Sequence, residues 1–201
     1  MVKVAIFDYG AGNIFSLKSS LEKNEAEVDI ITDLKKIKNY SGLLLPGVGN
    51  FDPAIRSLDT SKDAFHDLVK NQTPVLGICL GMEMFFERSE EGKLGGLGIL
   101  DGEVILLPNK FKIPHMGWND LQIKQPSVLL EGIKEGSWVY FVHSYRVKPK
   151  NDDIIKADSD YGINVPAVIE SQTLFGTQFH PEKSGKVGSL MIKNFLRVCK
   201  K

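Results

Sequence analysis

Few cysteines and no excess of either charge restrict what this 201-residue sequence encodes. With 25 basic and 25 acidic side chains, it lacks the net charge that draws a chain to nucleic acid or to a membrane surface. Its two cysteines form no disulfide framework, and no Cys-x-x-Cys or His/Cys grouping indicates a metal site. No apolar run approaches the ~20 residues of a membrane span, and residues 2–7 are too short and strand-like for a secretory signal. We expect a single domain over residues 1–201.

One of the two cysteines, Cys79, lies in a segment that predicts a nucleophile elbow. Gly77 and Gly81 flank it, an apolar strand-like run (74–76) precedes it, and a run that predicts a helix (82–87) follows. A nucleophile on a sharp strand-to-helix turn needs very small residues two positions to either side, because the backbone folds back on itself there. The turn would also place the sulfur at a helix N-terminus, where the thiolate is favoured. Taken alone, the segment equally fits a buried structural cysteine.

A second segment favours catalysis. The run 173–179 is strand-like, and His180 and Glu182 follow it, two residues apart. In an extended chain such residues lie on the same side, and Pro181 stiffens their spacing. A thiol, an imidazole that takes its proton and a carboxylate that orients the imidazole form an activated nucleophile. Singly, His180 fits a structural role and Glu182 a solvated charge; with the elbow in the same chain, we predict a Cys79, His180 and Glu182 triad.

The order of hydrophobic patterns predicts an α/β fold. Strand patterns alternate with helical patterns in the first half: 2–8, 14–23, 27–32, 41–45 and 63–70. This order predicts a mostly parallel central sheet flanked by helices, with the site at the carboxyl ends of the strands. Strand-like runs with short links predict antiparallel pairing in the second half: 104–107, 118–123, 138–147, 165–169 and 174–179. An amphipathic helix over 186–200 closes the chain.

The loop after the third strand is a candidate for oxyanion binding. Gly47 and Gly49 straddle Val48, so a peptide unit there can turn its N–H towards a ligand with little steric cost. In an elbow enzyme one oxyanion donor is the N–H after the nucleophile, here that of Leu80, and the second comes from a neighbouring loop. We predict that Val48 supplies the second donor and that the two glycines border the substrate. The alternative is an ordinary loop.

A glycine-rich turn after the first strand, residues 10–13, also fits part of a dinucleotide-binding fingerprint. The third glycine of that fingerprint is missing, because Phe15 occupies its position. A tight turn capped by Asn13 is the better interpretation, and no cofactor is predicted from it.

Taken together, these residues resemble the class I, triad-type glutamine amidotransferases over essentially the whole chain. The details are similar to the glutaminase subunits of imidazole glycerol phosphate synthases. The elbow and the His-Pro-Glu sequence mark the large family, whereas the His-Met-Gly-Trp-Asn sequence and the Lys-Ser after His-Pro-Glu select the subgroup. The segments that carry the resemblance are 8–13, 46–49, 77–82, 114–119, 140–145 and 179–184.

The resemblance implies that the chain hydrolyses L-glutamine to glutamate and ammonia. It implies a heterodimer with a (βα)8-barrel cyclase that uses the ammonia in histidine biosynthesis, and low activity until the cyclase and its ligand are present. No metal or cofactor is implied. A reactive thiol also fits a reducing compartment, which predicts the cytoplasm.

One position departs from the family pattern. The family has glutamine four residues after the nucleophile, and this chain has Glu83. The resemblance places that side chain against the amino-acid end of the substrate. A carboxylate accepts hydrogen bonds from an α-ammonium but repels an α-carboxylate. Glu83 is therefore expected to contact glutamine differently or to weaken its binding, unless it is a solvated helix residue.

The resemblance also assigns candidates further along the chain. His115 and Trp118 lie in a segment rich in ring surface and glycine, which indicates an interface; by resemblance it faces the cyclase, where Lys183 is expected to pair with a carboxylate. The alternative for Trp118 is a place in the core. By resemblance only, the backbone around Ser144 and Tyr145 lines the glutamine pocket, whereas His66 and His143 are interpreted as structural.

Three other functions remain open on the sequence. The glutaminase of another synthase, such as anthranilate synthase, shares the triad but not the His-Met-Gly-Trp-Asn segment. A general cysteine hydrolase would act on peptides or esters without a partner. A nucleotide-binding module would use the turn at residues 10–13 and would bind nicotinamide or flavin cofactors.

Overall fold

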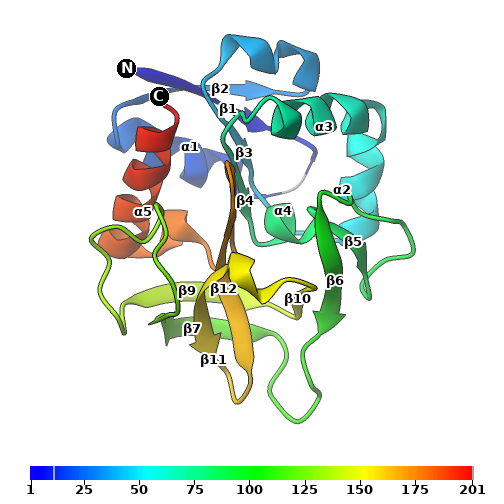
Figure 1. The fold of residues 1–201 in the computed structure, drawn as a ribbon, viewed down its shortest axis with the longest axis vertical. Coiled ribbons are helices and arrows are strands. Elements are labelled where there is room, and N and C mark those ends of the chain that lie inside the picture. The colour runs from blue at the N-terminus through cyan, green and yellow to red at the C-terminus, as the bar shows by residue number, and fades with distance from the viewer. Residues whose placement is uncertain (11, 201) are drawn as a thin grey trace.

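Eight strands form the central sheet, seen from its edge in the middle of Figure 1. This computed structural model describes residues 1–10 and 12–200; Ala11, inside the predicted turn at residues 10–13, and Lys201 lie outside the described residues. The spatial order of the strands is β2 (Ala26–Ile31), β1 (Val2–Phe7), β3 (Leu43–Leu45), β4 (Val75–Ile78), β13 (Leu174–Thr177), β12 (Asn164–Ser171), β11 (Ile155–Asp160) and β8 (Gln122–Ile123). The first five pair in parallel and the last three continue in antiparallel fashion, which confirms the predicted α/β fold.

Helices cover both faces of the parallel part of the sheet. α1 (Ile14–Lys23) and α5 (Gly185–Val198) lie on one side, and α2 (Phe51–Leu58) and α3 (Lys62–Lys70) on the other (Figure 1). Alternation along β1 sends Val4 and Ile6 into the core beneath α1 and α5, and Ala5 and Phe7 into the core beneath α2 and α3. Because both faces are buried, the central strands are apolar throughout.

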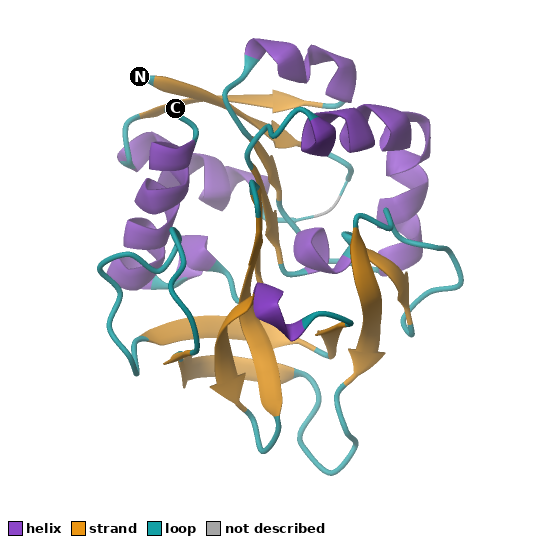
Figure 2. Cartoon of the chain, in the orientation of Figure 1, coloured by secondary structure: helices purple, strands orange, loops and turns teal. Residues whose placement is uncertain are grey.

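Two smaller sheets stand beside the central one, in the lower part of Figure 2. One contains β10 (Tyr145–Pro149), β6 (Leu100–Leu106) and β5 (Phe86–Ser89); the other contains β7 (His115–Asp120) and β9 (Trp138–His143). Short 3-10 turns complete the chain: η1 (Leu34–Asn39), η2 (Asp59–Ser61), η3 (Asp152–Ile154) and η4 (Pro181–Lys183). Within residues 1–10 and 12–200, every helix is too short or too polar to cross a membrane.

The helix predicted after the elbow is much shorter than expected. α4 spans only Leu80–Glu83, and the chain then turns into β5. Met84, Phe85 and Phe86 are all fully buried. A surface helix needs a polar face, which this run lacks, and the core takes it up as a turn and the start of a strand.

The single strand predicted over residues 138–147 is two strands in different sheets. β9 pairs with β7, whereas β10 pairs with β6, and the chain changes sheets at Ser144. Likewise, the strand predicted over 118–123 divides into β7 and β8. Periodicity alone does not reveal such a change, because both strands are apolar and extended. The break turns the backbone of residues 143–145 towards the elbow.

Apart from the 3-10 turns and β5, one helix and one strand were not predicted. α2 begins at Phe51, and its length of 8 residues and internal Pro53 make a weak helical signal. β11 contains Lys156 and Asp158, and register shifts interrupt its pairing with β12. Such irregularities break the alternation on which strand prediction depends. Both elements depend on tertiary packing.

Contact-distance packing of glycines holds the elbow together. A Cβ atom on Gly77 would lie 2.7 Å from the backbone of Gly81, and one on Gly47 would lie 2.6 Å from Gly81 N. A Cβ on Gly81 itself would overlap the carbonyl oxygen of Leu45. The turn that follows β4 therefore packs directly on the end of β3, with backbone against backbone. This explains why residues without side chains flank the nucleophile.

Gly81→Ala is expected to destabilise the fold severely, because the added methyl group has no room beside Leu45. The free energy of unfolding, measured by urea denaturation, should fall by about 3 kcal/mol or more. Gly95→Ala is the matched control, since its Cβ would meet only Glu87 O at 3.6 Å. Equal stability of the two variants would contradict the packing argument.

Candidate active site

Cys79 occupies the strained apex of the elbow. It follows β4 directly and has φ 51° and ψ −109°, a conformation that costs free energy for a residue with a side chain. Its amide N donates to Thr177 O at 2.7 Å, which ties the apex to the neighbouring strand. The side chain is 7% exposed. A strained backbone conformation at the end of a strand, held in place by neighbouring strands, is typical of a nucleophile elbow.

Parallel pairing of β4 with β13 brings the second half of the predicted triad to the same edge of the sheet. Ile78 pairs with Thr177, so Cys79 and His180 leave adjacent strands at their carboxyl ends. The amide of His180 donates to Tyr140 O at 2.9 Å, and Ser184 Oγ donates to His180 O at 2.7 Å. These bonds fix the backbone that carries the imidazole.

His180 and Glu182 meet in a turn and not along an extended chain, which corrects the predicted geometry. Residues 181–183 form the 3-10 turn η4, and this turn folds Glu182 back onto the ring. His180 Nδ1 and Glu182 Oε1 are 2.9 Å apart, and both side chains are at least 96% buried, with exposures of 2% and 4%. The carboxylate accepts, so Nδ1 carries a hydrogen, and the tautomer with its hydrogen on Nδ1 has its lone pair on Nε2. Nε2 is buried and has no hydrogen-bond partner among the described residues.

The thiol is held neutral, contrary to the expectation that the elbow favours the thiolate. Burial, and next the charge of Glu83, raise the pKa of Cys79 well above its ordinary value, although the Leu80 N–H acts in the opposite direction. A helix of one turn contributes little dipole. Sγ contacts Gln178 Nε2 at 3.7 Å and Val142 O at 3.9 Å. The imidazole is thus a neighbour at the strand edge, not a hydrogen-bond partner of the resting thiol.

A cavity of about 300 Å³ opens onto the sulfur. Most of the predicted site residues line it: Val48, Gly49, Cys79, Leu80, Glu83, Ser144 and Tyr145. It is also lined by Glu91, Pro114, Val142 and His143. Its size suits a ligand as small as an amino acid. The carboxyl groups in its wall favour a ligand that carries a cationic group.

Glu83 is a cavity residue and not a solvated helix residue. Its side chain is 4% exposed, and its carboxyl accepts from Gln178 Nε2 at 3.1 Å. Burial, together with the nearby charge of Glu91, raises its pKa to about 7. Near neutral pH the carboxyl is therefore divided between the neutral and the ionised form.

The predicted oxyanion loop is clamped at its base. The Tyr9 hydroxyl donates to Pro46 O, and Gly47 is buried against Leu80 and Gly81. Gly47 therefore packs behind the cavity and does not line it. Val48 remains 39% exposed at the cavity wall, and its donation to an oxyanion stays a prediction.

Comparison with known proteins agrees with this geometry. The family model described as "Glutamine amidotransferase class-I" matches residues 5–199. The chain belongs to this family. It is an enzyme, a class I glutamine amidotransferase.

The amidotransferase is similar to curated relatives over nearly its whole length. It is 46% identical to imidazole glycerol phosphate synthase subunit HisH of Geobacillus sp. (strain WCH70), covering 97% of this chain and 96% of that one. It is 43% identical to the protein of the same name from Methanocaldococcus jannaschii, with 97% and 99% covered. These identities hold across bacterial and archaeal sources.

Solved structures share the fold at low sequence identity. A structure of PurLQS from Thermotoga maritima superposes with a TM-score of 0.78 at 18% identity, covering 98% of this chain and 99% of that one. A glutamine amidotransferase from the same organism gives 0.74 at 13% identity, with 100% and 99% covered. At these identities the likeness shows the fold alone.

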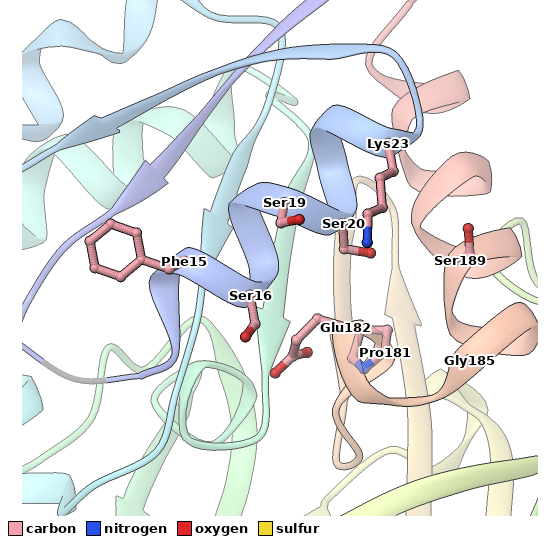
Figure 3. A pocket seen from close by; sticks show the side chains of 9 residues that line it. All are labelled: Phe15, Ser16, Ser19, Ser20, Lys23, Pro181, Glu182, Gly185 and Ser189. Atoms are coloured by element: carbon pink, nitrogen blue, oxygen red, sulfur yellow. The ribbon is translucent and has the colours of Figure 1, made fainter.

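A second cavity of about 490 Å³ lies on the other side of the triad carboxylate. Figure 3 shows the carboxylate of Glu182 beneath α1, whose Ser16 points towards it, with Gly185 and Ser189 of α5 along the rim. Glu182 Oε2 is buried without a hydrogen-bond partner among the described residues. Phe15, at the edge of this cavity, is 80% exposed.

The three predicted interface residues differ in exposure. Trp118 is 52% exposed, so it is not a core residue, and Lys183 is exposed with its Nζ 5.9 Å from the centre of the Tyr140 ring. His115 is 3% exposed and stacks on the Phe141 ring. The exposure expected of His115 is therefore wrong, because the ring is buried, and its place in a partner interface stays a prediction.

Four residues at the site were not predicted: Tyr9, Glu91, His143 and Gln178. Glu91 Oε2 accepts from Phe51 N at 3.0 Å at the cavity wall. His143 Nε2 and His115 Nδ1 are 2.9 Å apart, and burial lowers the pKa of His143 to about 3, so the ring is neutral. A polar residue inside an apolar, strand-like run can be recognised from the sequence as a candidate site residue, because its burial is costly without a partner. His143 and Gln178 both lie in such runs. Tyr9 and Glu91 carried no such signal.

Within residues 1–10 and 12–200, no three His, Cys, Asp or Glu side chains are grouped so as to hold a metal ion.

Glu83 should make stability depend on pH. Its folded pKa of about 7 lies above its ordinary 4.5, so its contribution is fully present below pH 4.5 and is lost as the pH rises through about 7. Relative to Glu83→Gln, the wild-type free energy of unfolding should fall by ~3 kcal/mol between about pH 4 and about pH 8. Urea denaturation across this range measures it. Glu22→Gln, at an exposed carboxylate, is the control, and parallel curves for wild type and Glu83→Gln would refute the prediction.

Proposed function

We propose that this amidotransferase hydrolyses L-glutamine to glutamate and ammonia as the glutaminase subunit of imidazole glycerol phosphate synthase, in histidine biosynthesis. The observation that carries the proposal is an elbow cysteine that opens onto a cavity of amino-acid size, at the end of a strand whose parallel neighbour leads into a buried His–Glu pair. The 46% identity to a relative of that name supports the choice of synthase.

The mechanism follows from the assigned side chains. His180 Nε2 accepts the thiol proton of Cys79, and Sγ bonds to the side-chain carboxamide carbon of glutamine. The N–H groups of Leu80 and Val48 bind the oxyanion that forms. When the C–N bond breaks, His180 gives its proton to the nitrogen, which leaves as ammonia and not as an amide anion.

The second half of the reaction releases glutamate. Water loses a proton to His180 Nε2 and attacks the glutamyl thioester, and the thiol regains a proton as the C–S bond breaks. Throughout, Glu182 holds the Nδ1 hydrogen, which keeps the lone pair on Nε2. The residues in this cycle supply the proton transfers and the charge stabilisation.

The resting geometry supports low activity in the free chain. The thiol has a raised pKa, and its contacts are to Gln178 and Val142. Activation requires a shift that brings Sγ and Nε2 into hydrogen-bond range and directs the Val48 N–H towards the oxyanion. We propose that a bound partner supplies this shift.

The proposed partner is a (βα)8-barrel cyclase that forms a heterodimer and joins the ammonia to its own substrate, a lyase reaction in the cytoplasm. Exposed apolar side chains lie on one face of the β7–β9 pair: Met116 is 61% and Trp118 52% exposed. Lys183, one residue after the triad carboxylate, lies over Tyr140 of β9. A partner on this face would contact the turn that carries Glu182.

Cys79→Ser should abolish glutamine hydrolysis while the fold and partner binding persist, because the hydroxyl is a far weaker nucleophile in this site. Ammonia and glutamate release is measured with and without the purified cyclase and its nucleotide ligand. Wild type should be strongly stimulated by the complete system. Retained turnover in the variant would refute the assignment, and stimulation by an anthranilate synthase partner instead of the cyclase would identify the sibling enzyme.

Trp118→Ala should weaken cyclase binding by about 2 kcal/mol or more, as expected for a large aromatic side chain at the centre of an interface. Titration calorimetry and the cyclase concentration needed for half-maximal glutaminase activity both measure this. Leu106→Ala, at a side chain that is 45% exposed on β6, is the control. Unchanged affinity of the Trp118 variant would remove this face from the proposed interface.

A further inference from the structure

Gln178 touches the nucleophile but takes no part in the mechanism above. It lies just beyond β13 and is fully buried. Its Nε2 is 3.7 Å from Cys79 Sγ and 3.1 Å from Glu83 Oε1. An amide nitrogen carries two hydrogens, so it can donate to both partners at once. One side chain therefore joins the sulfur to the buried carboxyl.

Glu83 selects the orientation of this amide. The carboxyl lies on α4, whose backbone is fixed by the bond from Glu83 N to Cys79 O at 3.0 Å. An ionised carboxylate only accepts, so it holds the amide with nitrogen towards α4. In this orientation Gln178 Oε1 is buried without a hydrogen-bond partner among the described residues, which costs free energy. The contacts on the nitrogen side therefore decide the orientation.

A hydrogen bond from the Gln178 amide stabilises the thiolate form of Cys79, because little water reaches the sulfur. Cys79 is 7% exposed, and a thiolate formed there needs hydrogen bonds from the protein in place of those from solvent. An N–H that faces sulfur favours the charged form over the neutral one. If the amide were reversed, its oxygen would face the sulfur and oppose ionisation.

We propose that Gln178 and Glu83 form a positioning pair for the nucleophile: Glu83 fixes the Gln178 amide through one N–H, so that the other faces Cys79 Sγ and stabilises the thiolate. This inference rests on the proposed role of Cys79 as the nucleophile. Glu83 thus acts on the sulfur in two ways, through the amide it orients and through its own opposing charge. The departure from the family pattern at position 83 gives this chain an anchor that, in its ionised form, accepts but does not donate.

The titratable groups on the elements around Cys79 and Glu83 are Tyr9, Glu83, Glu91, His143, Tyr145, His180 and Glu182. Only Glu83 among these shares a hydrogen-bond donor with the sulfur. A test must therefore change Gln178 and Glu83 separately and together while the others stay in place.

The experiment is a double-mutant cycle read by the reactivity of the thiol. Gln178→Met, Glu83→Met and the double variant are made on a Cys199→Ala background, so that Cys79 is the single cysteine. Alkylation by iodoacetamide is followed as a function of pH in the full-length chain, and circular dichroism checks the fold. Gln122→Met, on the edge strand β8, is the matched control.

Gln178→Met should move the midpoint of the alkylation profile upwards by roughly one pH unit. At a fixed pH near 8 the alkylation rate should fall about three- to tenfold. The fraction of thiolate falls about tenfold, but the thiolate of a less acidic thiol is more nucleophilic, which offsets part of the loss. In the Glu83→Met background the same change should alter the rate less than about twofold, because the amide is no longer held there. The control should leave the profile in place.

Two results would overturn the proposal. An unmoved midpoint in Gln178→Met would remove the amide from the control of the thiol. Equal shifts in both backgrounds would show that Glu83 does not anchor it. In the complex with the cyclase, Gln178→Met should lower kcat with little change in KM, and the reverse pattern would make Gln178 a substrate contact instead.

The thiol assay needs neither glutamine nor a partner, so the two proposals fail separately. A chain whose thiol shows the expected coupling but never releases ammonia would overturn the glutaminase assignment alone. A chain with full cyclase-stimulated glutaminase activity and no coupling would overturn the positioning pair alone.

Discussion

The approach of backbone to backbone at the elbow is the constraint on which the site depends. Gly81 packs on Leu45 O and Gly77 on Gly81, so β3, β4 and the turn after β4 form one rigid unit. This unit, together with the bond from Cys79 N to Thr177 O, holds Cys79 at a positive φ of 51°. The same packing fixes Gly47 against Leu80, which sets where the oxyanion loop begins. The predicted nucleophile, the predicted oxyanion donors and the cavity therefore share one support.

Parallel pairing of β4 with β13 positions His180 and Glu182 relative to the elbow. β13 comes from the far end of the sequence, yet it lies beside β4 in register, so His180 and Cys79 leave the sheet at the same edge. The turn η4 then folds Glu182 onto the imidazole. Catalytic groups gathered from distant segments in this way can be moved by small shifts of the strands that carry them. This suits the proposed dependence of the activity on a bound partner.

Electrostatics in this site oppose the chemistry at rest. Burial and the Glu83 charge favour the thiol over the thiolate, and the cavity wall adds a second carboxyl, Glu91. Against this stand only short-range donors, the Leu80 N–H and the Gln178 amide. A nucleophile held neutral at rest agrees with the low activity proposed for the free chain. The pKa of the Cys79 thiol, and with it the reactivity of the sulfur, is therefore set by the same few neighbouring groups.

Local patterns in the sequence were sufficient for much of the fold and for the triad. The elbow glycines, the His-Pro-Glu segment and the alternation of strand and helix in residues 1–78 each follow from short-range sterics and periodicity. Prediction failed where burial overrode the local pattern. Met84 to Phe86 were assigned to a helix but enter the core as a turn and a strand. His115 was assigned to a surface but stacks on Phe141 in the core.

The sequence by itself determined which residues could do chemistry, because a thiol between glycines and a histidine followed by Pro-Glu, each ambiguous alone, favour catalysis when they occur in one chain. Only the tertiary structure decided their state. The pKa of the thiol, the neutrality of His143 and the contact of Gln178 with Glu83 depend on burial and on neighbours that are distant along the chain, such as Gln178, which is 99 residues from Cys79 and 95 from Glu83. Burial and charge act through space, and no local pattern records which distant groups the fold will bring together.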